Sequence, residues 1–408
     1  FSSSATELFV RASGEKTGYA YTQDLCEDSK DVLMRALRNS FPVERAQRDE
    51  LNRPSIDKKI FRSDEEKSPD IMSMKSMAKD LEKYIWTVEP NIIDVAVDIR
   101  AENFLSHVIN SYGLAVASVM NIYCISASVV AEKNGNQYNA SFYESVPELS
   151  HLNFNKFGEK ISAVLKHQYD AVEIESGEYK VVLDSSVVTN IMMTSWQLFS
   201  GMKYNDGSSV LSGKLGEIIG SGSFSLINTP SHELTGYNYK FDCEGTPSKR
   251  QILVDKGKFV GLMHNISSAS KLAASPTGNA GRYALLSGSI PTDIIITPKI
   301  IHVIPGEKSL AEMLKDMGNG IYITESYDVF HSINIGSGEF SIPCRGTVIK
   351  NGKGDHNITG MTMCGKLIDL FKSVISAGND LYIEEFLRKS YCVGGPSLLI
   401  EKLQINGE

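Results

Sequence analysis

The chain has no long hydrophobic run and no cluster of basic residues. Its apolar stretches fall well short of the roughly 20 residues that a membrane-spanning helix needs, so we expect no membrane partner. Lysine and arginine total 41 against 49 aspartates and glutamates, which gives a net charge of -8 over 408 residues. Because binding to nucleic-acid phosphates requires a concentrated basic surface, this balance predicts no nucleic-acid partner.

Motifs of self-contained catalytic sites are missing too. The eight histidines never lie three to five residues apart, and no HExxH sequence occurs, so we expect no zinc site within one helix. No CxxC pair is present, and six widely spaced cysteines predict reduced thiols in a cytoplasmic protein. Neither a GxSxG turn nor a phosphate loop ending in Lys-Ser/Thr is found.

Two partial signals have ordinary explanations. His232-Glu233 resembles half of a metal motif, but it lies between Pro230 and Gly236 and is typical of a surface turn. Cys392 would need an electropositive site and a partner base to act as a nucleophile, and an ordinary thiol is the simpler interpretation. A metal site assembled from distant histidines stays an open alternative.

What the sequence does contain is a strand that leads directly into a helix at 179–201. The apolar run at 181–183 ends at Asp184, whose side chain can cap the start of a helix. Apolar residues three and four positions apart predict a helix over 187–199, stopped by Gly201. Many hydrolases hold catalytic side chains at such a junction, yet this helix has no His, Glu, Asp or Cys.

Residues 1–175 predict an N-terminal domain of mixed α and β layers. Apolar and polar residues alternate over 91–100 as in a half-buried strand, and Asn-Gly at 134–135 is typical of a hairpin turn. Residues 45–70 are almost wholly polar and predict a loop or linker. Helical spacing of apolar residues recurs in three segments, 28–40, 73–85 and 152–169.

Residues 176–408 predict a second domain, rich in antiparallel β-structure, and the whole chain is therefore assigned to the α+β class. A Ser-x-x-Glu capping box at Ser309 predicts a helix that ends near Gly318, and apolar spacing predicts another helix over 367–376. Short apolar or alternating segments predict strands at 223–228, 250–254, 259–263, 294–296, 339–350 and 397–405.

Two loops in this second domain are the strongest candidates for a binding role. Residues 241–250, FDCEGTPSKR, combine both charge signs with turn-forming residues, and residues 275–282, SPTGNAGR, are nearly all small. A backbone can approach closely at their glycines. On their residues alone, both loops are either tight structural turns, which we favour, or the lining of a peptide groove.

These loops resemble the corresponding segments of the TldD/PmbA family, whose members were first described as modulators of DNA gyrase. The blocks GEKSLAEM, GEFS, GND and PSLLIE follow them in the same order as in that family, and the match is most specific from about residue 181 to the end. The resemblance implies a metalloprotease of two homologous subunits that cleaves unfolded or extended peptides. It makes seven residues candidates for substrate binding: Glu244, Gly245, Thr246, Pro247, Thr277, Gly278 and Asn279.

The chain departs from the family where the metal would bind. TldD-type subunits carry His-Glu-x-x-x-His on the helix after the strand at 181–183, and the matching residues here are Met193, Thr194 and Leu198. None can replace a zinc-binding histidine or the glutamate base. The resemblance thus implies a PmbA (TldE)-type chain in a cytoplasmic homo- or heterodimer. It would have no catalytic residue, metal or cofactor of its own, and zinc is expected only in a TldD-type partner.

Two other functions stay open. A self-sufficient hydrolase would use Cys392 or distant histidines, and it would lose activity when Cys392 is replaced or a chelator is added. A non-enzymatic scaffold that binds peptides would show affinity unaltered by metal and no gain of turnover with any partner.

Overall fold

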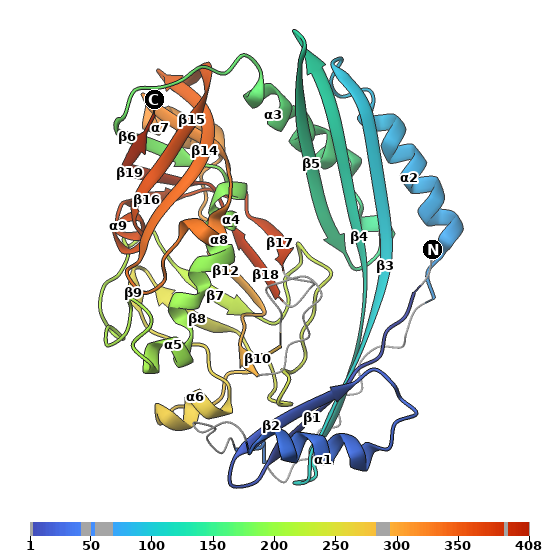
Figure 1. Cartoon of the computed structure of the whole chain (residues 1–408). Coiled ribbons are helices and arrows are strands. Elements are labelled where there is room, and N and C mark those ends of the chain that lie inside the picture. The colour runs from blue at the N-terminus through green and yellow to red at the C-terminus, as the bar shows by residue number, and fades with distance from the viewer. Residues whose placement is uncertain (1–2, 42–49, 54–67, 283–293, 387–390, 408) are drawn as a thin grey trace.

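The computed structural model combines helices and sheets in the α+β arrangement that the sequence predicts. An open three-stranded sheet stands beside a larger, β-rich body, and the N-terminal segment forms a third layer across one end of both (Figure 1). The residues that the structure describes are 3–41, 50–53, 68–282, 294–386 and 391–407. Among them, no helix is both long enough and apolar enough to cross a bilayer.

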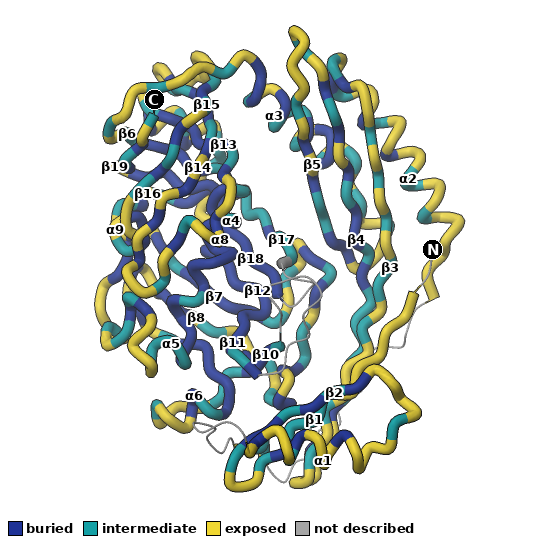
Figure 2. Tube along the Cα trace, viewed as in Figure 1, coloured by how far each residue is buried: buried dark blue, intermediate teal, exposed yellow. Residues whose placement is uncertain are grey.

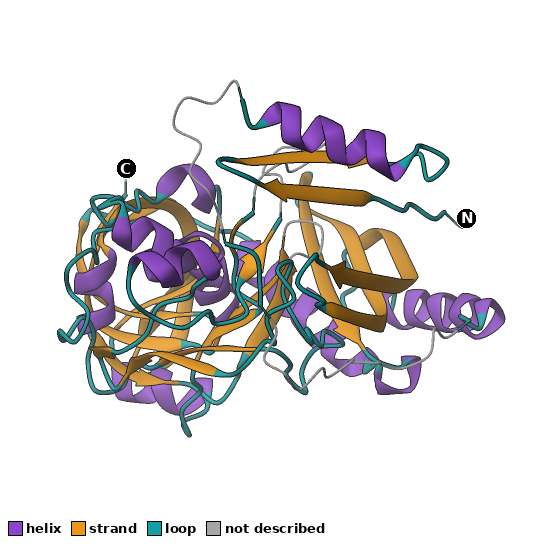
Figure 3. Ribbon diagram, turned by 90° about the horizontal axis from the view of Figure 1, so that it is seen from below, coloured by secondary structure: helices purple, strands orange, loops and turns teal. Residues whose placement is uncertain are grey.

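The N-terminal layer is an antiparallel strand pair with one helix. It consists of β1 (Leu8–Ser13), β2 (Thr17–Thr22) and α1 (Ser29–Asn39). Helix α1 covers the outer face of the pair (Figure 3), because its buried Val32 and Ala36 pack on Ala12 and Ala20. A Cβ atom at Gly18 would lie 2.0 Å from the Ala36 carbonyl oxygen, so only glycine allows this close approach.

The three-stranded sheet has two helices on one face. Its order is β3-β4-β5, and the turn between β4 and β5 uses Asn134 and Gly135 with φ of 54° and 79°, as a type I′ hairpin requires. The helices bury Leu81, Ile85, Phe157, Ile161 and Leu165 against the sheet. The elements are α2 (Ile71–Ile85), β3 (Ile92–Ile109), β4 (Ala115–Lys133), β5 (Asn136–Val146), a short 3₁₀ turn (Leu149–His151) and α3 (Phe154–Gln168).

The β-rich body contains two six-stranded sheets. One has the order β17-β18-β12-β7-β8-β9, and the other has the order β15-β14-β13-β6-β19-β16 with an added β15–β19 pairing. The first uses β7 (Leu226–Thr229), β8 (Gln251–Asp255), β9 (Lys258–Phe259), β12 (Ile300–Val303), β17 (Tyr382–Phe386) and β18 (Tyr391–Gly395). The second uses β6 (Gly177–Leu183), β13 (Gly320–Ser326), β14 (Glu339–Lys350), β15 (Lys353–Lys366), β16 (Val374–Ala377) and β19 (Leu398–Asn406).

Helix α4 (Ser185–Ser195) lies at the centre of this body and is buried along nearly its whole length (Figure 2). Asp184 caps it through a hydrogen bond from the Ser186 backbone N–H, as predicted. Its apolar side chains join one continuous core with both sheets. The remaining elements are α5 (Gly201–Asn205), α6 (Ile266–Lys271), β10 (Ala280–Gly281), β11 (Ile295–Ile296), α7 (Leu310–Met317), α8 (Val329–Ser332) and α9 (Leu367–Lys372).

Some predicted boundaries were wrong. Gly201 does not stop the central helix, because a 3₁₀ turn (Trp196–Phe199) follows α4 and the backbone becomes extended at Ser200. Gly201 begins α5 instead, where a Cβ would lie 2.3 Å from the imidazole of His264. The helix predicted over 367–376 ends at Lys372, and Val374–Ala377 pairs with β19 as β16, which suits its β-branched residues. The strands predicted at 223–228 and 259–263 are shorter than expected.

The polar segment predicted as a linker, 45–70, lies largely outside the described residues. Its described part includes Asn52, whose side-chain amide donates to the Glu244 carbonyl oxygen at 3.1 Å. The Asn52 carbonyl in turn accepts a 2.7 Å hydrogen bond from the Asn110 side chain. This part of the segment therefore lies between the end of β3 and the β-rich body.

Candidate functional site

Met193, Thr194 and Leu198, the three positions that the family resemblance aligns with the metal motif, lie inside the core. Leu198 is fully buried, and Met193 and Thr194 are 9% and 4% exposed. The Thr194 hydroxyl is buried without a hydrogen-bond partner in the described part of the chain. Zinc requires several imidazole, thiolate or carboxylate ligands, and a thioether suits copper(I) better. These residues do not fit a zinc ion, and the described residues contain no cluster of three His, Cys, Asp or Glu that could hold a metal.

The histidines do not assemble into a site elsewhere. His232 lies in a turn, as predicted, and its ring meets that of His302 edge-on, with centroids 5.1 Å apart. His302 is buried on β12, and burial lowers its pKa to about 4, so the ring is neutral at pH 7. Its Nδ1 lies 3.0 Å from the Val303 carbonyl oxygen. Two neutral imidazoles with no third ligand among the described residues do not make a zinc site.

Cys392 lies on β18 and is fully buried. Burial raises the pKa of its thiol far above the ordinary value, and the Tyr239 hydroxyl lies 3.9 Å from the sulfur. A nucleophilic cysteine needs the opposite conditions, a lowered pKa and access for substrate. The thiol is therefore inert in this setting, as its interpretation from sequence suggested.

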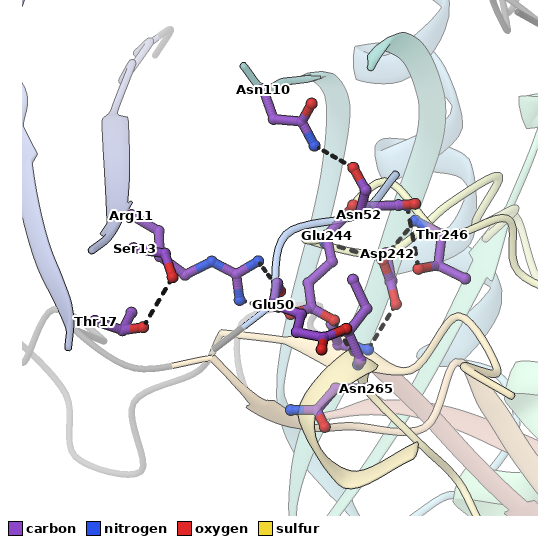
Figure 4. A network of polar contacts seen from close by, with 12 residues as sticks. Arg11, Ser13, Thr17, Glu50, Asn52, Asn110, Asp242, Glu244, Thr246 and Asn265 are labelled. Atoms are coloured by element: carbon purple, nitrogen blue, oxygen red, sulfur yellow. Dashed lines mark hydrogen bonds and ion pairs between the residues drawn. The ribbon is translucent and has the colours of Figure 1, made fainter. Parts of the chain in front are cut away.

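The loop from 244 to 247 is held by buried polar contacts. The Glu244 carboxylate accepts a 2.6 Å hydrogen bond from the Arg11 guanidinium and a 2.8 Å bond from the Ile266 backbone N–H (Figure 4). Glu244 is only 3% exposed, and burial raises its pKa while Arg11 opposes that shift. Asp242 accepts backbone N–H groups from Glu244, Thr246 and Ala280, each at 2.9 Å. Asp242 thereby joins this loop to the second one.

The second candidate loop packs directly against the first. A Cβ on Gly278 would lie 2.6 Å from the Pro247 carbonyl oxygen, and Gly278 has φ of 78°. Asn279 is fully buried; its amide donates to the Thr297 carbonyl, and its side-chain oxygen accepts the Thr277 hydroxyl, both at 2.8 Å. The side chains of Glu244 and Asn279 thus form hydrogen bonds within the protein that hold the two loops in place.

Four other candidate residues differ in their exposure to solvent. Gly245 is buried in the tight turn, whereas Pro247 is exposed and Thr246 and Thr277 are half-buried. Substrate binding by the seven candidate residues stays a prediction. It would depend on Thr246, Pro247 and Thr277, which solvent can reach. No local pattern singles out Arg11, which lies 233 residues before its partner Glu244.

A cavity of about 790 Å³ lies between the three-stranded sheet and the β-rich body. On one side it is lined by α3 and the β5 strand, and on the other by the start of α4, β13, Asp380 and β17. Its size falls within the range typical of ligand-binding pockets. The sequence could not reveal it, because its lining comes from segments spread between residues 94 and 384.

Two sheet edges face this cavity. Each of β5 and β17 has only one strand neighbour among the described elements, and residues of both line the cavity. The Asn139 and Tyr143 carbonyls of β5 accept side-chain hydrogen bonds from Gln168 at 2.9 Å and Tyr382 at 3.5 Å, so they point away from β4. Ser141 lies between them with the same outward orientation, because the backbone direction alternates along a strand.

Known proteins are similar to this chain in sequence and in fold. Residues 176–407 match the model of the PmbA/TldA metallopeptidase C-terminal domain. A metalloprotease PmbA homolog of Haemophilus influenzae is 22% identical over 299 residues, which cover 73% of this chain and 61% of that protein. Among the first relatives found, the chain spans 44% to 62% of their own length.

Two solved structures have the same fold over nearly the whole chain. A candidate modulator of a DNA gyrase from Thermotoga maritima superposes with a TM-score of 0.79 and 25% identity, covering 98% of this chain and 89% of that one. TldE from Thermococcus kodakarensis superposes with a TM-score of 0.81 and 19% identity, covering 99% and 90%. Because the family model covers more than half of the residues, the chain belongs to the PmbA/TldA metallopeptidase family.

Proposed function

We propose that this chain is the metal-free subunit of a TldD/PmbA-type zinc metalloprotease complex and holds the substrate for a metal-bearing, TldD-type partner. The observation that carries the proposal is the filling of the metal-motif positions by Met193, Thr194 and Leu198 in a closed core. A zinc peptidase needs several protein ligands for the metal and a base for its water. These side chains supply neither, so the metal and the base belong to the partner.

The substrate class is unfolded or extended peptides. Each of β5 and β17 has one strand neighbour among the described elements, so a chain could add to the free side of either, although Gln168 and Tyr382 already occupy two β5 carbonyls. This mode of binding requires little sequence selectivity. The 790 Å³ cavity between the two strands suits a short extended segment and is too small for a folded domain. Both features support a role in holding peptides rather than in cleaving them.

The complex is proposed to be a cytoplasmic heterodimer. All six cysteines are unpaired, as in proteins of a reducing compartment. Because the described residues contain no cluster that could hold zinc, we propose that peptidase activity requires a heterologous, metal-binding partner. The chain shares its fold with TldE from Thermococcus kodakarensis.

Reconstitution tests the proposal. An unfolded, fluorogenic peptide would be incubated with the chain alone, with a TldD-type subunit alone, and with both. We expect turnover only with both subunits, and its loss on adding a zinc chelator. Chelator-sensitive turnover by the chain alone would show that it has its own metal site. Peptide binding with no gain of turnover beside an active TldD-type subunit would favour the non-enzymatic scaffold instead.

A further inference from the structure

The cavity between the two bodies has an acidic lining. Its walls contain six carboxylates against two lysines, Lys156 and Lys160. Lys156 forms an ion pair with Glu144, which is not a lining residue, so this lysine does little to neutralise the carboxylates. His167 also lines the cavity, and burial lowers its pKa, which keeps it neutral at pH 7. The six acidic residues are Asp94, Glu159, Asp184, Glu325, Asp380 and Glu384.

Three of these carboxylates are fixed by the protein. Asp184 caps α4 and accepts the Tyr322 hydroxyl. Asp380 accepts the Ser397 backbone N–H at 2.9 Å and the Ser397 hydroxyl at 2.6 Å. Glu325 forms an ion pair with Arg345 at 3.1 Å. They contribute negative potential, but their oxygens already have partners.

Glu384 has a different environment. It lies on β17, the edge strand that faces the cavity, and its side chain is half-buried. Burial raises the pKa of Glu384, and the only group that opposes this shift is the hydroxyl of Tyr382. No cation of the described residues forms an ion pair with it. A half-buried carboxylate without a counter-ion is unfavourable, and an incoming cation would relieve that cost.

We propose that this cavity binds a cationic group, an ammonium or a guanidinium, carried by an extended peptide, with Glu384 as its principal partner. The proposal deepens the proposed function, on which it rests, by adding a charge preference to the substrate class. A peptide lying along β5 or β17 directs alternate side chains to opposite sides, so one of them faces the acidic wall. The charge comes either from a Lys or Arg side chain or from the peptide's amino terminus.

Three short fluorescent peptides of the same extended sequence separate these sources. The first is acetylated and has a central lysine, the second has a free amino terminus and norleucine for lysine, and the third is acetylated with norleucine. Fluorescence anisotropy at low ionic strength would measure their affinities for the isolated chain. We expect the first or the second peptide to bind about tenfold more tightly than the third, a gain typical of a charge-assisted hydrogen bond.

Single substitutions test which carboxylate causes the preference for a cationic peptide. Glu384→Gln should bring the cationic peptide to the affinity of the uncharged one, while Glu217→Gln, which removes an exposed carboxylate outside the cavity, should retain the tenfold preference. Asp94→Asn and Glu159→Gln change exposed residues on the N-terminal side of the cavity and should each give a smaller loss. These two variants keep the test decisive if Glu384→Gln does not fold.

The outcomes separate this inference from the proposed function. Equal binding of all three peptides, or a preference that survives Glu384→Gln, would overturn the cation site and leave the peptide-holding role intact. Failure of all three to bind would overturn both. Charge-selective binding to a chain that never activates a TldD-type partner would support the cation site and contradict the peptidase role.

Discussion

Replacing Glu244 with glutamine should release the N-terminal layer from the β-rich body. The Arg11 and Glu244 side chains are only 10% and 1% exposed, and their 2.6 Å ion pair joins β1 to the loop after β7. Glutamine keeps the volume of the side chain but removes its charge. Arg11 is then left buried without a counter-ion, and breaking such a pair costs about 3 kcal/mol or more.

Other contacts limit the damage to a local opening. Arg282 forms a 2.7 Å ion pair with Glu7 and stacks over the Phe9 ring at 3.6 Å, so it holds the same layer at a second point. A cost of about 3 kcal/mol corresponds to a roughly hundredfold rise in the opening equilibrium. Hydrogen exchange of the backbone amides in β1 and β2, followed by mass spectrometry, would report that rise directly.

Two control variants test whether the change in exchange comes from the Arg11–Glu244 ion pair. Glu339→Gln removes an exposed carboxylate that contacts Lys366 at 4.0 Å and accepts the Ser337 hydroxyl at 3.3 Å, and it should leave exchange in β1 and β2 unchanged. The double variant Arg11→Gln/Glu244→Gln should cost less than the sum of the single changes, because they share one contact. Unchanged exchange together with weaker peptide binding in Glu244→Gln would refute the structural role and favour the substrate role predicted from sequence.

Three further predictions concern stability, each measured by urea unfolding. Burial lowers the pKa of His302 from 6.5 to about 4. Below pH 6.5 the unfolded chain therefore binds a proton that the folded one does not, so the stability is complete above pH 6.5 and falls as the pH approaches 4. Wild type should lose about 3 kcal/mol more than His302→Asn over that window, and equal losses would contradict this. Ser309→Ala removes the capping box of α7 and should lower the free energy of unfolding by about 1 kcal/mol. An unchanged urea midpoint would show that the cap does not stabilise the protein. Gly278→Ala combines positive φ with a 2.6 Å clash and should cost more than Gly113→Ala, which has positive φ and open space; equal costs would refute the close approach.

Local signals in the sequence predicted much of the fold. Asn134-Gly135 and Asn351-Gly352 form hairpin turns with positive φ at all four residues, and the Ser309 capping box starts α7 as expected. Each of these features is decided by residues adjacent in the chain. Val374 was misassigned to a helix because its spacing fits one, whereas its partner, Ile400 of β19, lies 26 positions later.

The candidate site was harder to predict, for the same reason. Glu244 and Asn279 stand in turn-like sequences, and nothing local shows that their side chains are buried by Arg11 and Thr297. The cavity is a product of two bodies packing together, so none of its lining segments is distinctive alone. The residue types at Met193, Thr194 and Leu198, by contrast, can be read directly from the sequence, and the absence of a zinc site there stays a prediction.

The absence of bound zinc from this chain is tested most directly by elemental analysis of the purified chain, expressed alone in medium supplied with zinc, beside its complex with a TldD-type subunit. Met193, Thr194 and Leu198 cannot ligate zinc, so we expect near-zero zinc in the isolated chain and about one zinc per heterodimer in the complex. About one zinc per molecule of the isolated chain would show that it is not a metal-free subunit. The next step would then be to replace the histidines and Cys392 in search of the ligands.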